Sequence, residues 1–392
     1  MTAYDRPPRA PRRHVFLSLG FRPFFMGAAA HAALLVPLWL ALFTQGLRLP
    51  LGFEPLVWHA HEMVFGYTGA VIAGFLLTAI PNWTGRAPLT GLPLGALFAS
   101  WIAGRAALLF GAACGPLASL IDLVFPILLA TWVWRELLSS RYRNGTLVGA
   151  MVTLFAAANA GFHLQHALGG GYVAGYRAGI LAITGLISVI GGRIVPAFTR
   201  NWLVARGETH LPESGVQRDR AVIATTLLAL AAWLVRPDGL PSGLLLGVAA
   251  LVQAWRLAGW RGLATRTEPL LFVLHVGYAW LPLALALLAL AAVLPAVPAS
   301  AALHALTAGA IGMLTIAVMS RASLGHAGRP LSADRALTGC YVLVGLGALL
   351  RVAAPWLPGG YIVVIGVSGL VWAAGFLGFL VKFAPLWTAP RA

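Results

Sequence analysis

Charged side chains are scarce in this sequence: Asp, Glu, Lys and Arg make up 10% of 392 residues, whereas 59% are hydrophobic. Soluble domains carry about 25% charged residues, so this chain has too little charge to cover a soluble surface. Cysteine is almost absent as well, with only Cys114 and Cys340. We expect these two at different depths of a membrane, which argues against a disulfide between them. Any metal would therefore be held mainly by histidine.

Long hydrophobic runs take the place of the missing charge. Runs of about 20 residues recur from end to end, and each can cross a bilayer core of about 30 Å. A helix is the only form in which one such run satisfies its own backbone. We therefore predict an all-α integral membrane protein with about twelve transmembrane helices. The expected spans are 23–45, 58–80, 91–112, 116–136, 146–168, 174–196, 221–236, 241–258, 268–293, 299–320, 335–354 and 360–383.

The net charge is +16, and the basic residues are distributed unequally between the loops on the two sides of the membrane. With a cytoplasmic N-terminus, most arginines fall in inner loops, and the outer side keeps only Arg48, Arg177, Arg236 and Arg351. This is the positive-inside bias of a bacterial inner-membrane protein with both termini cytoplasmic, and it argues against nucleic-acid binding. We expect a basic cytoplasmic segment at 1–22, one polytopic domain in the lipid bilayer at 23–383 and a short cytoplasmic tail at 384–392.

Five histidines are expected at one membrane level near the outer face. They open span two, close span five and lie about one turn into span ten: His59, His61, His163, His166 and His304. His163 and His166 share one helical face, whereas His59 and His61 cannot both face one partner. Imidazole suits haem iron, copper and zinc, so this layer predicts a metal site. The alternative for each histidine alone is an interfacial side chain without metal.

Other buried polar residues add to this pattern. Glu62 follows His61 and could orient a ligand histidine, relay a proton or end in interfacial water. Arg105 and Asp122 fall at comparable depth in spans three and four and are expected to form a buried pair. Both readings of that pair, structural and proton-conducting, stay open.

Span nine carries a second combination. His275 and Tyr278 lie three residues apart on one face, deeper than the histidine layer. Tyr278 is either redox-active or proton-donating, or packs normally with a hydrogen-bonded hydroxyl. His31 is expected at a similar inner depth in span one.

Similar sequences at the ends of three spans suggest internal pseudo-repeats. Spans two, six and ten lie four helices apart, and each leaves the membrane on the cytoplasmic side with Thr or Ser, Arg, and Asn or Gly, at 78–89, 193–203 and 319–331. Three pseudo-repeated four-helix units would explain this match. Similar basic loop composition is the alternative.

Several long blocks resemble the NnrS family of bacterial inner-membrane proteins. They are LGFRPFF at 19–25, WHAHEMVFGYTGAVIAGFLLTAIPNWTGR at 58–86, GR at 192–193 with PAFTRNW at 196–202, LHVGYAW at 274–280 and HALTAGAIGMLTIAVMSRASLGHAGRPL at 304–331. The resemblance covers nearly the whole chain. It implies a protein with haem and copper that is linked to nitric oxide metabolism, denitrification and nitrosative stress. The family blocks contain His59, His61, Glu62, His275, His304 and His326.

In helix order the chain also looks like the catalytic subunit of haem–copper oxidases and nitric oxide reductases. There, histidines on helices two and ten clamp a haem, and further histidines hold copper. The similarity implies a haem, expected to be haem b, clamped by His59 or His61 with His304. Copper would be left to His163, His166 and His275, although His275 is expected to lie too deep for a single dinuclear site.

The function implied is chemistry of nitric oxide at haem or copper, with Glu62 and Tyr278 as candidate catalytic residues. One interpretation is a nitric oxide reductase-like enzyme that takes electrons from quinol. The alternatives are a non-catalytic haem or copper protein that senses nitric oxide or protects iron centres, and a transporter for a metal or small solute. A repeated pair of broken helices, which would favour the transporter, is not evident in the sequence.

Overall fold

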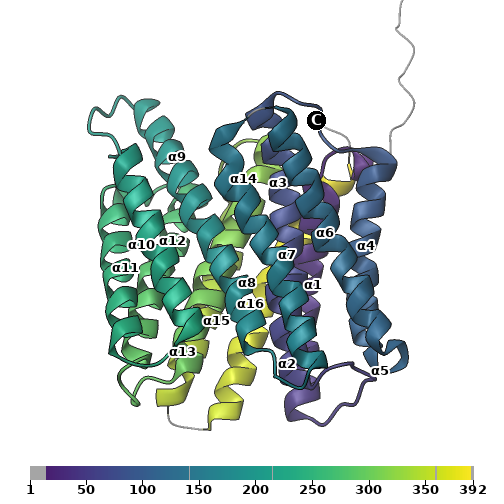
Figure 1. Ribbon diagram of the computed structural model, residues 1–392. Coiled ribbons are helices and arrows are strands. Elements are labelled where there is room, and N and C mark those ends of the chain that lie inside the picture. The colour runs from purple at the N-terminus through teal and green to yellow at the C-terminus, as the bar shows by residue number, and fades with distance from the viewer. Residues whose placement is uncertain (1–14, 141, 214, 358–359, 390–392) are drawn as a thin grey trace, which may run out of the picture.

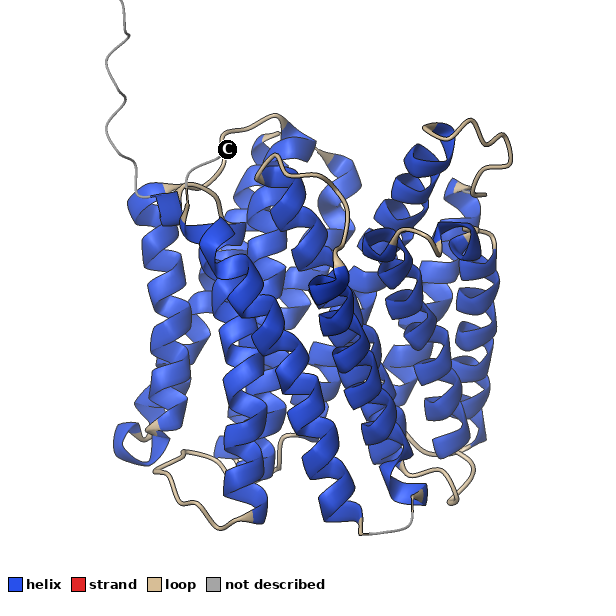
Figure 2. Cartoon of the chain, turned by 180° about the vertical axis from the view of Figure 1, so that it is seen from behind, coloured by secondary structure: helices blue, strands red, loops and turns tan. Residues whose placement is uncertain are grey.

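The computed structural model describes residues 15–140, 142–213, 215–357 and 360–389. Within these ranges every regular element is a helix and none is a strand (Figure 2). The long helices run side by side from one end of the molecule to the other (Figure 1). The predicted all-α fold is confirmed.

The long helices follow one another with short connections. They are α1 (Phe21–Thr44), α2 (Pro55–His61) continued by η2 (Glu62–Tyr67) and α3 (Thr68–Thr84), α4 (Gly91–Leu109), α6 (Pro116–Ser139), α7 (Thr146–Ala167), α8 (Val173–Leu186) continued by η4 (Ile187–Gly191) and α9 (Gly192–Val204), α10 (Val216–Val235), α11 (Leu240–Ala258), α12 (Pro269–Ala291), α13 (Ala299–His304) continued by η6 (Ala305–Ile311) and α14 (Gly312–His326), α15 (Arg335–Ala353) and α16 (Tyr361–Thr388). Short helices at the bundle ends are η1 (Val15–Leu17), α5 (Gly111–Cys114), η3 (Arg143–Gly145), η5 (Gly262–Thr265) and η7 (Ala354–Trp356).

Helix boundaries follow local sequence signals. Pro55, Pro116 and Pro269 open α2, α6 and α12, where a missing N–H costs nothing because the first turn has no acceptor for it. Gly85 ends α3 with φ of 70°, a left-handed conformation that glycine adopts without strain. Proline and glycine therefore define where the apolar runs start and stop.

Among the described residues, eleven helices are long and apolar enough to cross a membrane, if each interrupted helix is counted once. The remaining long helix, α10, carries Arg218, Asp219 and Arg220 near its start, and these three charges exclude it from the eleven candidate membrane spans. It nevertheless packs against α8 and α11 within the bundle. The expected spans coincide with the twelve long helices, but α9 and α14 continue past the predicted ends to Val204 and His326.

Three long helices contain a π-helical segment: η2, η4 and η6. A π-turn inserts an extra residue into an α-helix and is frequently found at functional sites. The interrupted helices are the second, sixth and tenth, so the same feature recurs every four helices. This recurrence supports the predicted division into three units, α1–α6, α7–α11 and α12–α16. The ring of units closes where α16 packs against α1.

The two ends of the bundle differ in charge. We call the end where α2 and α13 begin the histidine end and the opposite one, where α3, α9 and α14 end, the arginine end (bottom and top of Figure 1). The histidine end has few basic residues, namely Arg48, Arg177, Arg236 and Arg351. The arginine end has many, including Arg86, Arg135, Arg143, Arg193, Arg200, Arg206, Arg218, Arg220, Arg256, Arg261, Arg266, Arg321, Arg329, Arg335 and Lys382.

Candidate functional site

His59 and His61 leave the same helix in different directions. Positions two apart on an α-helix differ by roughly 200° around its axis. The ring of His59 stacks on Trp39 of α1 with a centroid separation of 4.2 Å. The ring of His61 faces α6 and α7, where it meets Asp122 and Asn159. The expectation that these two histidines have different partners is confirmed.

A pocket of about 490 Å³ lies at the histidine end, between helices of all three units. Both His59 of α2 and His304 of α13 line it. Its volume is that of a typical site for a small molecule or cofactor. Most of its wall is apolar, and its aromatic members are Trp39, Phe43, Tyr67, Tyr172, Tyr176, Trp233, Tyr361 and Trp372.

The two pocket histidines are fixed differently. Nδ1 of His304 donates to the carbonyl of Ser300, one turn earlier, at 2.7 Å. This bond fixes the tautomer that keeps the lone pair on Nε2, which is the usual arrangement of a ligand histidine. The buried Nδ1 of His59, by contrast, has no hydrogen-bond partner among the described residues. The His304 ring is therefore oriented by a hydrogen bond, with Nε2 able to bind a metal, whereas the His59 ring is held mainly by stacking on Trp39.

Two guanidinium groups stand at the wall of this pocket. Arg351 donates through Nη2 to the hydroxyl of Ser300 at 3.0 Å, and its buried Nη1 has no partner within the described part of the chain. The guanidinium of Arg177 lies 5.0 Å from the ring centroid of Trp233. Unsatisfied guanidinium donors beside an apolar cavity favour a ligand that carries carboxylates.

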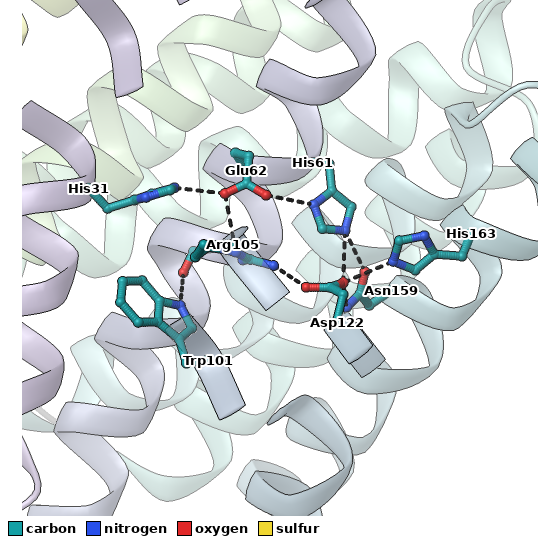
Figure 3. A network of polar contacts seen from close by, with 9 residues as sticks. His31, His61, Glu62, Trp101, Arg105, Asp122, Asn159 and His163 are labelled. Carbon is teal, nitrogen blue, oxygen red and sulfur yellow. Dashed lines mark hydrogen bonds and ion pairs between the residues drawn. The ribbon is translucent and has the colours of Figure 1, made fainter. Parts of the chain in front are cut away.

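A second site lies on the other face of α2, centred on Asp122 of α6 (Figure 3). Its Oδ2 is 2.9 Å from Nε2 of His163, 3.2 Å from Nε2 of His61 and 2.9 Å from Nδ2 of Asn159. Its Oδ1 accepts from Nη2 of Arg105, so the predicted Arg105–Asp122 pair is confirmed. One ligand atom each from His61, Asp122 and His163 lie within 4.8 Å of one another, close enough to share a metal ion.

Glu62 extends this cluster toward α1 and α4. Its Oε2 is 3.0 Å from Nε2 of His31 and 3.2 Å from Nε of Arg105, and its Oε1 is 3.4 Å from Nδ1 of His61 (Figure 3). Only 1% of Glu62 is exposed, so the reading of a carboxylate in interfacial water is wrong. The inner depth expected for His31 is also wrong, because it reaches the same layer as His61. These residues form what we call the histidine–carboxylate network: His31, His61, Glu62, Arg105, Asp122, Asn159 and His163.

The π-helical segment η2 shapes this network. Its Gly66 carbonyl accepts a hydrogen bond from Nε1 of Trp101 at 2.9 Å (Figure 3). A side chain at Gly66 would collide with Arg105 and would come within 2.9 Å of the Glu62 carboxylate. Glycine at this position is thus what lets the buried charges approach each other.

The structure does not bring all predicted metal ligands together. His166 is exposed and reaches only the edge of the Phe53 ring. His275 of α12 lies elsewhere, with Nε2 2.8 Å from the hydroxyl of Thr199 and its ring beside Trp260. The grouping of His163 with His166 and His275 is therefore not found, because His166 turns outward and His275 belongs to the deeper layer.

Tyr278 of α12 joins a different buried cluster, whose other members come from the second unit. Its hydroxyl donates to Oε1 of Gln253 at 2.9 Å and accepts from Nη1 of Arg256 at 3.2 Å. Arg256 also donates to Oδ1 of Asp219 at 2.9 Å and to the carbonyl of Ser188 at 2.8 Å. We call this cluster the arginine network: Ser188, Asp219, Thr226, Gln253, Arg256 and Tyr278. Tyr278 therefore belongs neither to the wall of the pocket nor to the histidine–carboxylate network.

Sequence reasoning missed three residues that complete the sites: Asn159, Arg177 and Arg351. Asn159 stands four residues before His163, so both lie on one face of α7, a signal that could have been read. Arg351 was placed only as an outer arginine, and its position at the pocket depends on how α15 packs beside α13. Such inter-helix packing leaves no local pattern.

Comparison with known families agrees with the blocks noted in the sequence. A family model described as NnrS protein matches residues 15–391. No curated protein matches the chain. Because the matched range is nearly the entire sequence, this chain belongs to the NnrS family.

Proposed function

We propose that this protein binds nitric oxide at a haem held between His59 and His304. The observation that carries this proposal is the pocket itself, in which two imidazoles from distant helices line one apolar cavity of about 490 Å³. The chain belongs to the NnrS family, and the resemblance to this family implies haem and copper, which supports the same conclusion. The helices involved are the second and the tenth, as the remoter similarity implies.

The residues of the pocket fit a haem. Its aromatic walls would pack against a macrocycle, while Arg177 and Arg351 offer guanidinium donors to the two propionates. His59 and His304 both line the pocket, and imidazole nitrogen is a donor of the type that haem iron takes. The haem would supply an iron centre that coordinates nitric oxide and exchanges electrons.

The two histidines would then have unequal roles. His304, oriented by its bond to Ser300, would be the permanent ligand. His59 is not fixed by a hydrogen bond at Nδ1, so it would be the exchangeable ligand. The haem would supply the iron that binds nitric oxide, and His59 would be the more weakly held of its two ligands.

A copper ion would lie in the histidine–carboxylate network. Nε2 of His61, Nε2 of His163 and Oδ2 of Asp122 converge there, and imidazole nitrogen is a ligand that copper accepts. Glu62 lies 3.4 Å from Nδ1 of His61, where it would orient that ring. The copper ligands proposed thus differ from the set expected from sequence, because His61 and Asp122 replace His166 and His275.

We further propose that the protein reduces nitric oxide in the bacterial inner membrane, with the arginine end and both termini in the cytoplasm. The concentration of arginine at one end supports this orientation. Two molecules of nitric oxide, two electrons and two protons give nitrous oxide and water. A quinol would supply both electrons and both protons as it becomes a quinone.

Optical spectra of the purified full-length protein test the haem. We expect a Soret band that shifts when nitric oxide is added. His304→Ala should lose the haem while the protein stays folded. His59→Ala should keep it in a five-coordinate form that binds nitric oxide faster. His166→Ala is the matched control, because its side chain is exposed, and should match the wild type.

A colourless wild-type protein, or full haem in His304→Ala, would contradict the proposed pocket. Consumption of nitric oxide with a reduced quinol, measured with an electrode under argon, then tests reduction. Binding without consumption would contradict the reductase and leave a nitric oxide-binding haem protein.

A further inference from the structure

Phe53 packs on the histidine–carboxylate network at the histidine end of the molecule. Its ring centroid is 5.8 Å from that of His163 and 5.9 Å from that of His61, and both of these imidazoles are buried. The same ring is 4.7 Å from the ring of His166, which is exposed. Phe53 itself is 8% exposed. One aromatic ring is therefore in contact with the exposed imidazole and with the two buried ones.

The loop that carries this ring is anchored to the short helix α5. We call this connection, residues 45–54, the α1–α2 loop (Figure 1). The N–H of Ala112 donates to the carbonyl of Pro50 at 2.9 Å, and Gly52 lies against Gly111. A Cβ atom on Gly111 would come within 2.5 Å of the backbone of Gly52, so this contact requires glycine. The loop is thus fixed by its backbone, and the aromatic ring is fixed with it.

Other approaches to the network suit a metal ion less well. The most exposed of its other members are His31 and Arg105, with 13% and 11% of their side chains exposed. His31 lies in the middle of α1, a candidate membrane span, where an ion would have to come from the hydrocarbon. The guanidinium of Arg105 repels a cation. The histidine end, at Phe53, is the approach that remains.

We propose that a metal ion enters the histidine–carboxylate network from the histidine end by passing Phe53, with His166 as the first ligand that it meets. The exposed imidazole of His166 can bind a transition metal from solution. His163 lies one turn earlier on the same face of α7, where the ion meets its next imidazole. Phe53 has no donor atom for a metal, so it controls the rate of entry and release and not the affinity.

The inference rests on the copper site of the proposed function and adds the route by which that site is filled. It applies to both oxidation states of copper, since it concerns access and not charge. It also gives a role to His166, which the proposed ligand set leaves out.

The first experiment measures access to the network without any metal. Diethyl pyrocarbonate, which carbethoxylates unprotonated imidazole nitrogens, is added to the metal-free full-length protein in detergent, and mass spectrometry follows each histidine. We expect His166 to react at least about tenfold faster than His163, because the reagent reaches His163 only when the loop opens locally. In Phe53→Ala, His163 should react at least about tenfold faster than in the wild type, and His166 at its wild-type rate.

Two further variants separate a closed entry from a general loosening. Gly111→Ala keeps the ring but must displace the α1–α2 loop, so it should also expose His163. Phe65→Ala removes a ring that is 2% exposed and lies 5.2 Å from His61, away from the loop, so it should leave the labelling of His163 unchanged. His275, 4% exposed and outside the network, reports the fold and should stay protected in every variant.

Equal labelling of His163 in Phe53→Ala and the wild type would overturn the inference, as would labelling of His163 as fast as His166 in the wild type. The same acceleration in Phe65→Ala would also count against it, since access would then not depend on the histidine end. A variant in which His275 becomes labelled has lost its fold, and Gly111→Ala and the wild type then decide the matter.

The second experiment measures copper exchange. Wild type and Phe53→Ala are loaded with Cu(II), excess EDTA is added, and bound copper is measured against time; uptake is followed after metal removal. Phe53→Ala should speed uptake and release by a similar factor of at least about ten and leave the dissociation constant unchanged. His166→Ala should slow both, because the first ligand on the route is lost.

Faster release in Phe53→Ala without faster uptake would mean weaker binding and not easier access, which would overturn the inference. Unchanged exchange in His166→Ala would remove His166 from the route. If neither the wild type nor Phe53→Ala binds copper, the copper site of the proposed function is contradicted, while the labelling experiment still decides whether Phe53 closes the network.

Discussion

The first and second four-helix units each contain a buried polar network on corresponding helices. In the first network, α2, α4 and α6 of the first unit and α7, the first helix of the next unit, supply His61, Arg105, Asp122 and His163. In the second network, η4, α10 and α11 of the second unit and α12, again the first helix of the next unit, supply Ser188, Asp219, Arg256 and Tyr278. The groups at the two centres differ. A carboxylate flanked by imidazoles occupies the first centre, whereas a guanidinium occupies the second.

This difference decides what each network can do. Arg256 is paired with Asp219 at 2.8 Å and bonded to Tyr278, so the second network is neutral and its cation is covalently part of the chain. The first network has two carboxylates for one guanidinium and offers two imidazole nitrogens. One scaffold thus carries a closed structural network and, separately, a group of ligand atoms that is the proposed copper site.

The largest effect that would separate the networks is loss of copper. Asp122→Asn should reduce bound copper to less than about a tenth of the wild-type amount, because it removes the anionic ligand and leaves Arg105 paired with Glu62 alone. Arg256→Met, the matched change in the other network, should leave copper per folded protein unchanged. Metal analysis of both purified variants checks this, and equal copper in Asp122→Asn and wild type would erase the distinction.

The next effect is on folding. Arg256→Met leaves Asp219 without its ion-pair partner, and breaking a buried pair costs about 3–5 kcal/mol. Because 26% of the Asp219 side chain is exposed, we expect the lower end of that range. Thermal unfolding in detergent measures the loss, while the haem spectrum should not change. An unaltered melting temperature would show that this network does not support the fold.

Tyr278→Phe tests whether the arginine network contributes to folding alone or also to nitric oxide consumption. It leaves Oε1 of Gln253 without its donor, and an unsatisfied buried acceptor costs about 1–3 kcal/mol. Nitric oxide consumption should stay at the wild-type rate, since Tyr278 reaches neither histidine site. A strong fall in rate with an unchanged melting temperature would instead restore the catalytic role considered for Tyr278 from sequence.

An exposed pair provides the smallest effect. The Lys382 ammonium beside Asp334, together with the backbone N–H of Leu337, lowers the pKa of the Asp334 carboxyl. The stability it adds is present above the unfolded-state pKa and is lost as pH falls through the lowered folded-state value. Asp334→Asn should cost less than about 1 kcal/mol, because the pair is solvent-exposed. Unfolding curves at pH 7 and at a pH below the lowered folded-state pKa should show this difference only at pH 7.

Much of the fold was readable because a membrane helix leaves strong local signals. Apolar length predicted the spans, and proline or glycine marked their ends. The spacing of His59 and His61 correctly predicted that they face different partners. Depth counting failed for His31, since helices are offset along their axes and the π-turn in η2 changes the register. Which ring of His163 and His166 turns inward depends on the packing of α7, which the sequence does not reveal.

Substitution of His59 and of His61 tests most directly whether the protein has two separate metal centres. Haem spectra and copper content should be recorded on His59→Ala and His61→Ala, prepared side by side from the full-length chain. We predict an altered haem spectrum with full copper in His59→Ala, and an unaltered haem spectrum with copper lost in His61→Ala. If both substitutions affected the same cofactor, the assignment of these neighbouring histidines to two separate centres would be contradicted.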